Sequence, residues 1–247
     1  MRFIISPAKK MRMDDDGMEC RGLPVFLEQT QLLMNRLREM DGAELQALWK
    51  CNDKIAALNM ERLRSMNLRA SLTPAVLAYE GIQYQYMAPA VFTDAQCEYI
   101  HEHLRILSGF YGLLRPFDGV VPYRLEMQAR LSVDGARDLY DFWGDRLAKA
   151  LCSETDCIIN LASKEYSSAV APHLPSGFRQ ITCVFGEERQ GKVVEKGTLC
   201  KKARGEMVRF AAEKRVSRPE ELQRFTGQHY CFSPKHSDES SYVFLLR

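Results

Sequence analysis

Basic side chains are the residues of this sequence best suited to binding a ligand, because they gather in three short stretches. Residues 1–10 hold three basic residues and no acidic one, and basic residues also outnumber acidic ones at 50–69 and 199–215. The formal net charge is only +2, so the rest of the chain must be acidic on balance. Such polarisation suits a protein that presents one face to phosphates and remains soluble as a whole.

Several of these cations lie at expected helix starts, turns or strands, where phosphates could reach them. The candidate DNA-binding residues are Lys9, Lys54, Arg105, Arg115, Arg124, Lys164, Lys201, Lys202 and Arg204. The last three open an expected helix whose opposite face is apolar, so we expect them to point away from the core. Cations at a helix start oppose its dipole, which is easier to explain if an anion binds there. A solvated helix surface is the alternative.

Carboxylates and an amide provide weaker catalytic candidates, namely Glu126, Asn160 and Glu165, with Asp118 and Asp145 as further carboxylates. A carboxylic acid in a basic cleft could act as a general acid in an enzyme that processes a nucleotide or a damaged base. Arg124 and Glu126 are two residues apart, so they would share one face of a strand. An internal salt bridge is therefore the simpler interpretation of that pair.

The sequence gives little support for a metal site, a redox-active site or a common nucleotide-binding motif. The sequence has no Walker A loop, GxGxxG, GxSxG or HExxH motif. Cys97 and His101 stand one helical turn apart, but no second pair has the spacing of a metal site. The eight cysteines form no Cys-x-x-Cys pair, which indicates reduced, mostly buried thiols. The five histidines are dispersed, so an iron-sequestering protein is disfavoured, and we expect neither metal nor cofactor.

Hydrophobic spacing and capping signals predict the elements that position these residues. Helices are expected at 25–40, 43–50, 54–66, 94–104, 137–152 and 199–215. Strands are expected at 2–6, 106–114, 122–127, 157–161, 179–185, 229–233 and 242–246, and a loop at 7–16 holds the acidic run 14–16. Strands and helices alternate irregularly and no linker or repeat divides the chain. We therefore expect an α+β fold over residues 1–247, a single domain with a mixed sheet, peripheral helices and a basic cleft.

Residues 43–66 resemble a helix-hairpin-helix element, in which two short helices are joined by a tight turn. The turn at 51–53 offers Asn52 or Asp53 as the cap of the second helix. Exposed N–H groups at a helix start can bind a phosphate, and Lys54 adds a positive charge there. Such elements usually have glycine in the turn, and this one has none. A plain αα-hairpin held by apolar packing remains the alternative.

A set of longer motifs runs in order along the chain. They are ISPAK at 5–9, NDKIAALN at 52–59, HLRILSGFYGLLRP at 103–116, PYRLEM at 122–127, DLYDFWGD at 138–145, INLASKEY at 159–166 and KKARG at 201–205. With these motifs the whole chain resembles the YaaA family of peroxide-stress resistance proteins, also called UPF0246. Where that family has Ser-Asp-Lys, this chain has Asn52-Asp53-Lys54, and asparagine also caps a helix. No cysteine falls on a motif position, which argues against a redox-active thiol.

The resemblance implies a fold peculiar to the family, with a basic cleft and a helix-hairpin-helix element. It implies binding to duplex or branched DNA with little sequence specificity, and a role in peroxide stress that limits iron-dependent DNA damage. The resemblance makes an enzyme the less favoured class. The start of the chain lacks the pattern of a signal peptide, and no apolar stretch reaches about 18 residues. We therefore expect a cytoplasmic, monomeric protein that does not contact membranes.

Overall fold

A short apolar strand near the start of the chain, β1 (Arg2–Ile5), lies in the middle of the main sheet, and its last three residues are buried. The computed structural model describes residues 1–13 and 18–247, so the predicted acidic run at 14–16 lies outside the described residues. Parallel partners flank β1 on both sides, β5 (Leu104–Ser108) and β8 (Cys157–Leu161). The centre of the sheet therefore joins segments that lie about 100 and 150 residues downstream of β1.

The sheet is mixed, as predicted from the irregular alternation of strands and helices. Two further strands continue the parallel set beyond β8, namely β9 (Arg179–Arg189) and β12 (Ser241–Leu246). Antiparallel strands complete it: β6 (Gly112–Leu114) on β5, β11 (Tyr230–Phe232) on β12 and β10 (Lys192–Val194) on β9. Two small ladders lie outside this sheet, β2 (Lys10–Met11) with β4 (Tyr79–Glu80) and β3 (Thr73–Pro74) with β7 (Gly119–Val120).

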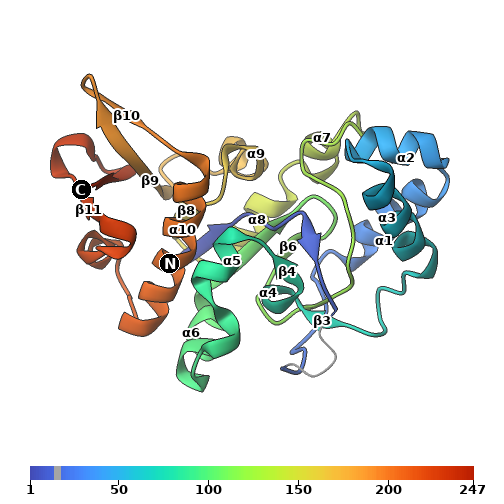
Figure 1. Cartoon of the computed structure of the whole chain (residues 1–247), viewed down its shortest axis with the longest axis horizontal. Coiled ribbons are helices and arrows are strands. Elements are labelled where there is room, and N and C mark those ends of the chain that lie inside the picture. Colours follow the sequence, from blue (N-terminus) through green and yellow to red (C-terminus); the bar gives the residue numbers. More distant parts are fainter. Residues whose placement is uncertain (14–17) are drawn as a thin grey trace.

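Helices surround the sheet and gather at its two ends. They are α1 (Leu27–Arg38), α2 (Gly42–Trp49), α3 (Asp53–Ser65), α4 (Ala75–Ala78), α5 (Ile82–Met87), α6 (Asp94–His103), α7 (Leu139–Trp143), α8 (Arg146–Glu154), α9 (Lys164–Ser167) and α10 (Gly197–Lys214). Figure 1 shows α1, α2 and α3 together at one end of the long axis, and α10 with β9, β10 and β11 at the other. In the described part of the chain, no helix is both long and apolar enough to cross a lipid bilayer.

The predicted pair of helices at 43–66 is confirmed. Asp41 and Glu44 form a capping box at the start of α2, and the Asn52 side chain accepts the N–H of Ile55 at the start of α3. Lys50 adopts a left-handed conformation (φ 46°) and ends α2, so the turn needs no glycine. Lys54 is exposed in the first turn of α3. A capping box of Thr93 and Gln96 also starts α6, which matches the helix predicted at 94–104.

Three segment predictions were wrong. Residues 106–114 form the hairpin of β5 and β6 rather than one strand, and the turn places Gly109 against the backbone of 125–127. Residues 122–127 pair with no strand and are coil. The helix expected at 137–152 is broken into α7 and α8 at Gly144, whose φ of +48° is incompatible with a continuous right-handed helix.

Candidate functional site

A cavity of about 510 Å³ opens at the carboxyl end of β1, where β1 and β8 run side by side. Ser6 and Ser163, which follow these strands closely in the chain, form its floor. Ser163 donates its backbone N–H to Ser6 Oγ (2.8 Å), and the two hydroxyl oxygens are 3.2 Å apart. Ligands of open sheets with parallel strands commonly bind outside the carboxyl ends of the strands, so the position is typical of a binding site.

One wall of the cavity depends on a close crossing of α5 and α10. Gly205 of α10 lies so near Gln83 of α5 that a Cβ at this position would overlap the Gln83 carbonyl oxygen. The crossing places Lys201 and Arg204 of α10 beside Gln83 in the lining of the cavity. On α5, the Tyr84 hydroxyl donates to the carbonyl oxygen of Ser6 at 3.0 Å, which connects this wall to the floor. The length of α5 and the absence of a side chain at Gly205 therefore position the two cations.

The opposite wall is an ion-pair network on the coil 122–127. Glu126 accepts from Lys9 Nζ at 2.6 Å and from Arg124 Nη2 at 3.2 Å. The same Arg124 nitrogen lies 3.5 Å from the carbonyl oxygen of Trp49, the last residue of α2. The wall of the cavity is thus connected directly to the α2–α3 hairpin. The internal Arg124–Glu126 salt bridge considered from the sequence is present, with Lys9 as an additional partner.

Glu165 of α9 faces the same cavity in a different electrostatic environment. Its Oε1 accepts the N–H of Gln128 at 3.3 Å. Burial raises the pKa of the Glu165 carboxyl, and the nearby Glu126 carboxylate raises it further, whereas the Gln128 N–H and Lys9 oppose the shift. Glu126 contacts two cations and Glu165 makes no ion pair among the described residues. The raised pKa suits Glu165 to act as a general acid, with the ion-paired Glu126 as its partner carboxylate.

Hydrogen-bond donors without acceptors lie in the walls of the cavity. Gln83 Nε2, Arg124 Nε and Arg204 Nε are buried and have no partner among the described residues. Gln83 is only 7% exposed, so water does not compensate its amide well. Buried donors are nearly always paired in native proteins, because an unpaired one costs about 1–3 kcal/mol. Small movements of these side chains would let a ligand rich in acceptor oxygens satisfy them.

Three tyrosines, Tyr84, Tyr123 and Tyr166, add aromatic surface to the lining. The Tyr123 hydroxyl is hydrogen-bonded to Tyr79 (2.8 Å) and to Ser108 (2.6 Å). Burial raises the pKa of Tyr123 to about 12, so the phenol is neutral at physiological pH. The three rings add apolar surface to the lining, against which a planar ligand could rest.

The structure brings only part of the predicted site together. Lys9, Arg124, Lys201, Arg204, Glu126 and Glu165 line the cavity. Lys202 points to another side of α10, where its Nζ lies 4.9 Å from the centre of the Tyr86 ring. Lys164 and Lys54 are exposed outside the lining. Asn160 is buried inside β8, where its amide bonds to Thr182 and accepts the N–H of Ala162.

Arg105 and Arg115 lie at a different place, with Glu154 as their common partner. Arg105 Nε donates to Glu154 at 2.7 Å, and Arg115 Nη2 is 3.8 Å from the same carboxylate. Arg2 also contacts Glu154, at 3.3 Å. Arg2 opens β1 and Arg105 lies near the start of β5, so this cluster is at the amino ends of the strands, whereas the cavity is at the carboxyl end of β1. Arg105 is buried in this ion-pair cluster.

The two remaining carboxylate candidates have local roles. Asp118 accepts the N–H of Arg115 at 2.8 Å and closes the turn after β6. Asp145 forms an ion pair with Lys149 one turn along α8. Among residues 1–13 and 18–247, no three His, Cys, Asp or Glu side chains converge as metal ligands. His101 and Cys97 are accordingly not joined by a third ligand there.

Several lining residues were missed from the sequence, notably Ser6, Lys10, Gln83, Tyr84 and Ser163. A signal existed for the two serines, because Ser6 ends one strand that was predicted as buried and Ser163 closely follows another. Recognising it required knowing that those two strands are parallel neighbours. No local signal marks Gln83 or Tyr84, whose place depends on the crossing of α5 with α10.

Comparison with known proteins finds the same family along nearly the whole chain. The family model described as "Peroxide stress protein YaaA" matches residues 1–236. A UPF0246 protein of Desulfitobacterium hafniense is 51% identical over 245 residues, which cover 99% of this chain and 98% of that protein. A UPF0246 protein of Lachnoclostridium phytofermentans is 50% identical over 245 residues, covering 99% and 96%. A third, of Lactiplantibacillus plantarum, is 49% identical over the full length of both chains.

Proposed function

This chain belongs to the family of the peroxide stress protein YaaA, and from that premise we propose that it is a DNA-binding protein that limits iron-dependent damage to DNA during peroxide stress. The observation that carries the proposal is the convergence of five cations on one cavity. They are Lys9, Lys10, Arg124, Lys201 and Arg204. The charges of two of them are not fully neutralised by carboxylates. Lys201 makes no ion pair among the described residues, and Arg204 pairs only with Glu195, at 3.3 Å.

The α2–α3 hairpin extends this basic surface. Lys50 and Lys54 are exposed on either side of the turn, where α3 begins. A phosphate bound there would be held by backbone N–H groups and the helix dipole. Arg124 Nη2 lies 3.5 Å from the carbonyl oxygen of Trp49, so the hairpin is in direct contact with the wall of the cavity. A DNA strand could thus touch the hairpin and the mouth of the cavity together.

The binding should tolerate any sequence. Phosphate contacts position a protein on DNA without reading bases. A protein that covers the sugar–phosphate backbone would keep iron away from the DNA, and it would not need to store the metal itself. The protein would act in the cytoplasm as a monomer.

Binding is tested by fluorescence anisotropy with two unrelated duplexes and a four-way junction over a range of salt concentrations. We expect similar affinity for the two duplexes and a decrease that is linear in the logarithm of the salt concentration, with a slope of about −0.9 per phosphate contact. Lys201→Glu should weaken binding about tenfold and reduce the slope by about one contact. It should not harm the fold, because an acidic residue in the first turns of α10 favours the helix dipole.

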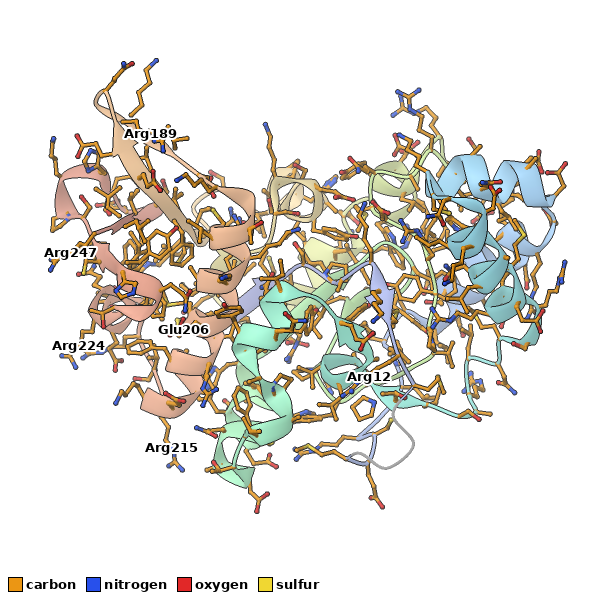
Figure 2. All side chains as sticks on the ribbon, in the orientation of Figure 1. Arg12, Arg189, Glu206, Arg215, Arg224 and Arg247 are labelled. Atoms are coloured by element: carbon orange, nitrogen blue, oxygen red, sulfur yellow. The ribbon has the colours of Figure 1, made fainter. Side chains whose placement is uncertain are left out.

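Arg224→Glu is the matched control, since it makes the same charge change at a different place. Figure 2 shows Arg224 at the outer edge of the C-terminal part of the molecule, away from α5. The control should bind DNA within about twofold of the unaltered protein. Binding that is independent of salt would contradict the proposal, and so would an equal loss in the two variants.

A further inference from the structure

We propose that the cavity hydrolyses the N-glycosidic bond of a single oxidised base that is flipped out of the DNA duplex. Glu165 is the proton donor and Glu126 is the partner carboxylate. This inference rests on the proposed DNA binding and adds a chemical step to it. It assigns the cavity an activity, the hydrolysis of an N-glycosidic bond, rather than a purely electrostatic role.

The size and lining of the cavity suit one nucleotide. Its volume of about 510 Å³ lies within the range of about 300–1,000 Å³ that is usual for small-ligand sites. A base inside a duplex cannot reach such a cavity, so it must leave the stack, which costs free energy. The rings of Tyr84, Tyr123 and Tyr166 offer apolar surface to the base, and Lys201 and Arg204 stand at the same cavity for the neighbouring phosphates.

The unpaired donors indicate which bases fit best. Gln83 Nε2, Arg124 Nε and Arg204 Nε all donate and none accepts, so a ligand needs acceptor oxygens to satisfy them. Oxidation by peroxide adds carbonyl or hydroxyl oxygens to bases. An oxidised base therefore makes more bonds here than an unmodified base, and a damaged base is also easier to unstack.

Glu165 has the properties of a proton donor. Its carboxyl lies in the cavity lining, has no cation partner among the described residues, and is partly removed from water. The groups around it are Glu126 and Lys9 across the cavity, Tyr166 in its own helix, and Tyr140 of α7, whose hydroxyl donates to the Glu165 carbonyl at 2.9 Å. Of these, only Lys9 is a cation, and its closest carboxylate is Glu126. Burial and the Glu126 carboxylate raise the pKa of Glu165, although Lys9 and the N–H groups of Gln128 and Met127 oppose the shift.

Glu126 is suited to the complementary role. Lys9 and Arg124 hold its carboxylate in place at 2.6 and 3.2 Å. Cleavage of a glycosidic bond develops positive charge at the sugar carbon C1′, and a fixed carboxylate stabilises that charge and accepts a proton from water. A carboxyl group with a raised pKa beside a carboxylate held by two cations is the kind of pair that such hydrolysis uses.

The step conserves atoms and charge. The bond between C1′ and the base nitrogen breaks as Glu165 gives its proton to the departing base. The oxygen of a water molecule forms a new bond to C1′, and the proton released from that water passes to the Glu126 carboxylate. The net change is the addition of water across the bond, which yields the free base and an abasic site.

The test uses the whole chain with otherwise identical duplexes that contain 8-oxoguanine, thymine glycol or no damage. Free base is measured by mass spectrometry, and DNA binding is measured on the same duplexes by anisotropy. We expect release from a damaged duplex, and a loss of about 100-fold or more with Glu165→Gln. Glutamine keeps the acceptor for the Gln128 N–H, so this variant should fold and bind DNA within about twofold. Glu239→Gln removes an exposed carboxylate outside the cavity and is the control.

The pH dependence separates a chemical role from a structural one. If Glu165 donates the proton, the rate of release falls as the pH rises through its raised pKa. The residual rate of Glu165→Gln should lack that decrease. Tight binding with no base released from any damaged duplex would overturn this inference and leave the proposed DNA binding intact. Release at an unchanged rate in Glu165→Gln would also overturn it, and an absence of DNA binding would remove both.

Discussion

Asp118 loses almost all contact with water when the chain folds, since 6% of it remains exposed. Burial raises the pKa of its carboxyl from 3.8 to about 6, although the Arg115 N–H and the nearby Arg115 and Arg105 charges pull in the other direction. In the unfolded chain the same group titrates near its ordinary value of about 3.9. The unfolded form is therefore the stronger acid, and ionisation between about pH 4 and 6 disfavours folding.

Asp118→Asn should remove this pH-dependent cost. The stability attributable to the protonated Asp118 is fully present below about pH 4, and it is lost as the pH rises through about 6. Asparagine can still accept the Arg115 N–H, so we expect the variant to be about 1–3 kcal/mol more stable than the unaltered protein at pH 7. The two should converge near pH 4. Urea unfolding from pH 4 to 7 measures both, and two parallel curves would contradict the assignment.

The crossing of α5 and α10 is the contact between elements on which the cavity depends. Gly205 permits it because a Cβ there would meet the carbonyl of Gln83, which belongs to a helical backbone and cannot turn away. Lys201 and Arg204 owe their position beside Gln83 to this approach. A change at one glycine should therefore affect both the stability of the fold and the shape of the site.

Gly205→Ala should destabilise the protein by about 2 kcal/mol or more, because the two helices must separate. DNA affinity should decrease in the fraction that remains folded, since Lys201 and Arg204 move with α10. Gly197→Ala is the control on the same helix, where an added Cβ meets nothing within 4 Å. That change should be neutral or stabilise by up to about 1 kcal/mol. Equal unfolding midpoints in the two variants would show that the crossing tolerates a side chain.

At the scale of the whole molecule, the described residues distribute potential iron ligands rather than gathering them. His101 packs against the ring of Phe117, and burial and the nearby Arg21 lower the pKa of its imidazole. Burial also raises the pKa of Cys97, which disfavours the thiolate that binds metals. These surroundings suit packing more than metal binding.

We therefore expect anaerobically purified protein to contain far less than one iron per chain. His101→Ala should leave DNA affinity unchanged within about twofold, because His101 lies outside the lining of the cavity. Elemental analysis and anisotropy measure the two outcomes. About one iron per chain that disappears in His101→Ala or Cys97→Ala would instead identify a metal-handling protein.

The sequence by itself determined the elements whose signals are local. The Thr93 capping box, the Asn52 cap and the apolar run of β1 each lie within a few neighbouring residues, so their elements were predicted close to their observed bounds. The motifs also determined the family, because they run in order through nearly the whole chain. Part of the site was within reach for the same reason. The predicted candidates that line the cavity all belong to those motifs, namely Lys9, Arg124, Glu126, Glu165, Lys201 and Arg204.

Only the tertiary structure decided which of these residues meet. β1 pairs with segments that lie about 100 and 150 residues away, and this pairing separates Lys9 at its carboxyl end from Arg105 at the amino end. From the neighbouring sequence alone, Arg105 could bind a phosphate or an internal carboxylate equally well. In the fold it pairs with Glu154, the last residue of α8. Gln83 enters the site through a helix crossing that one glycine permits. Periodicity and caps record short-range forces, whereas strand order and ion-pair partners depend on contacts that form only when distant segments pack together.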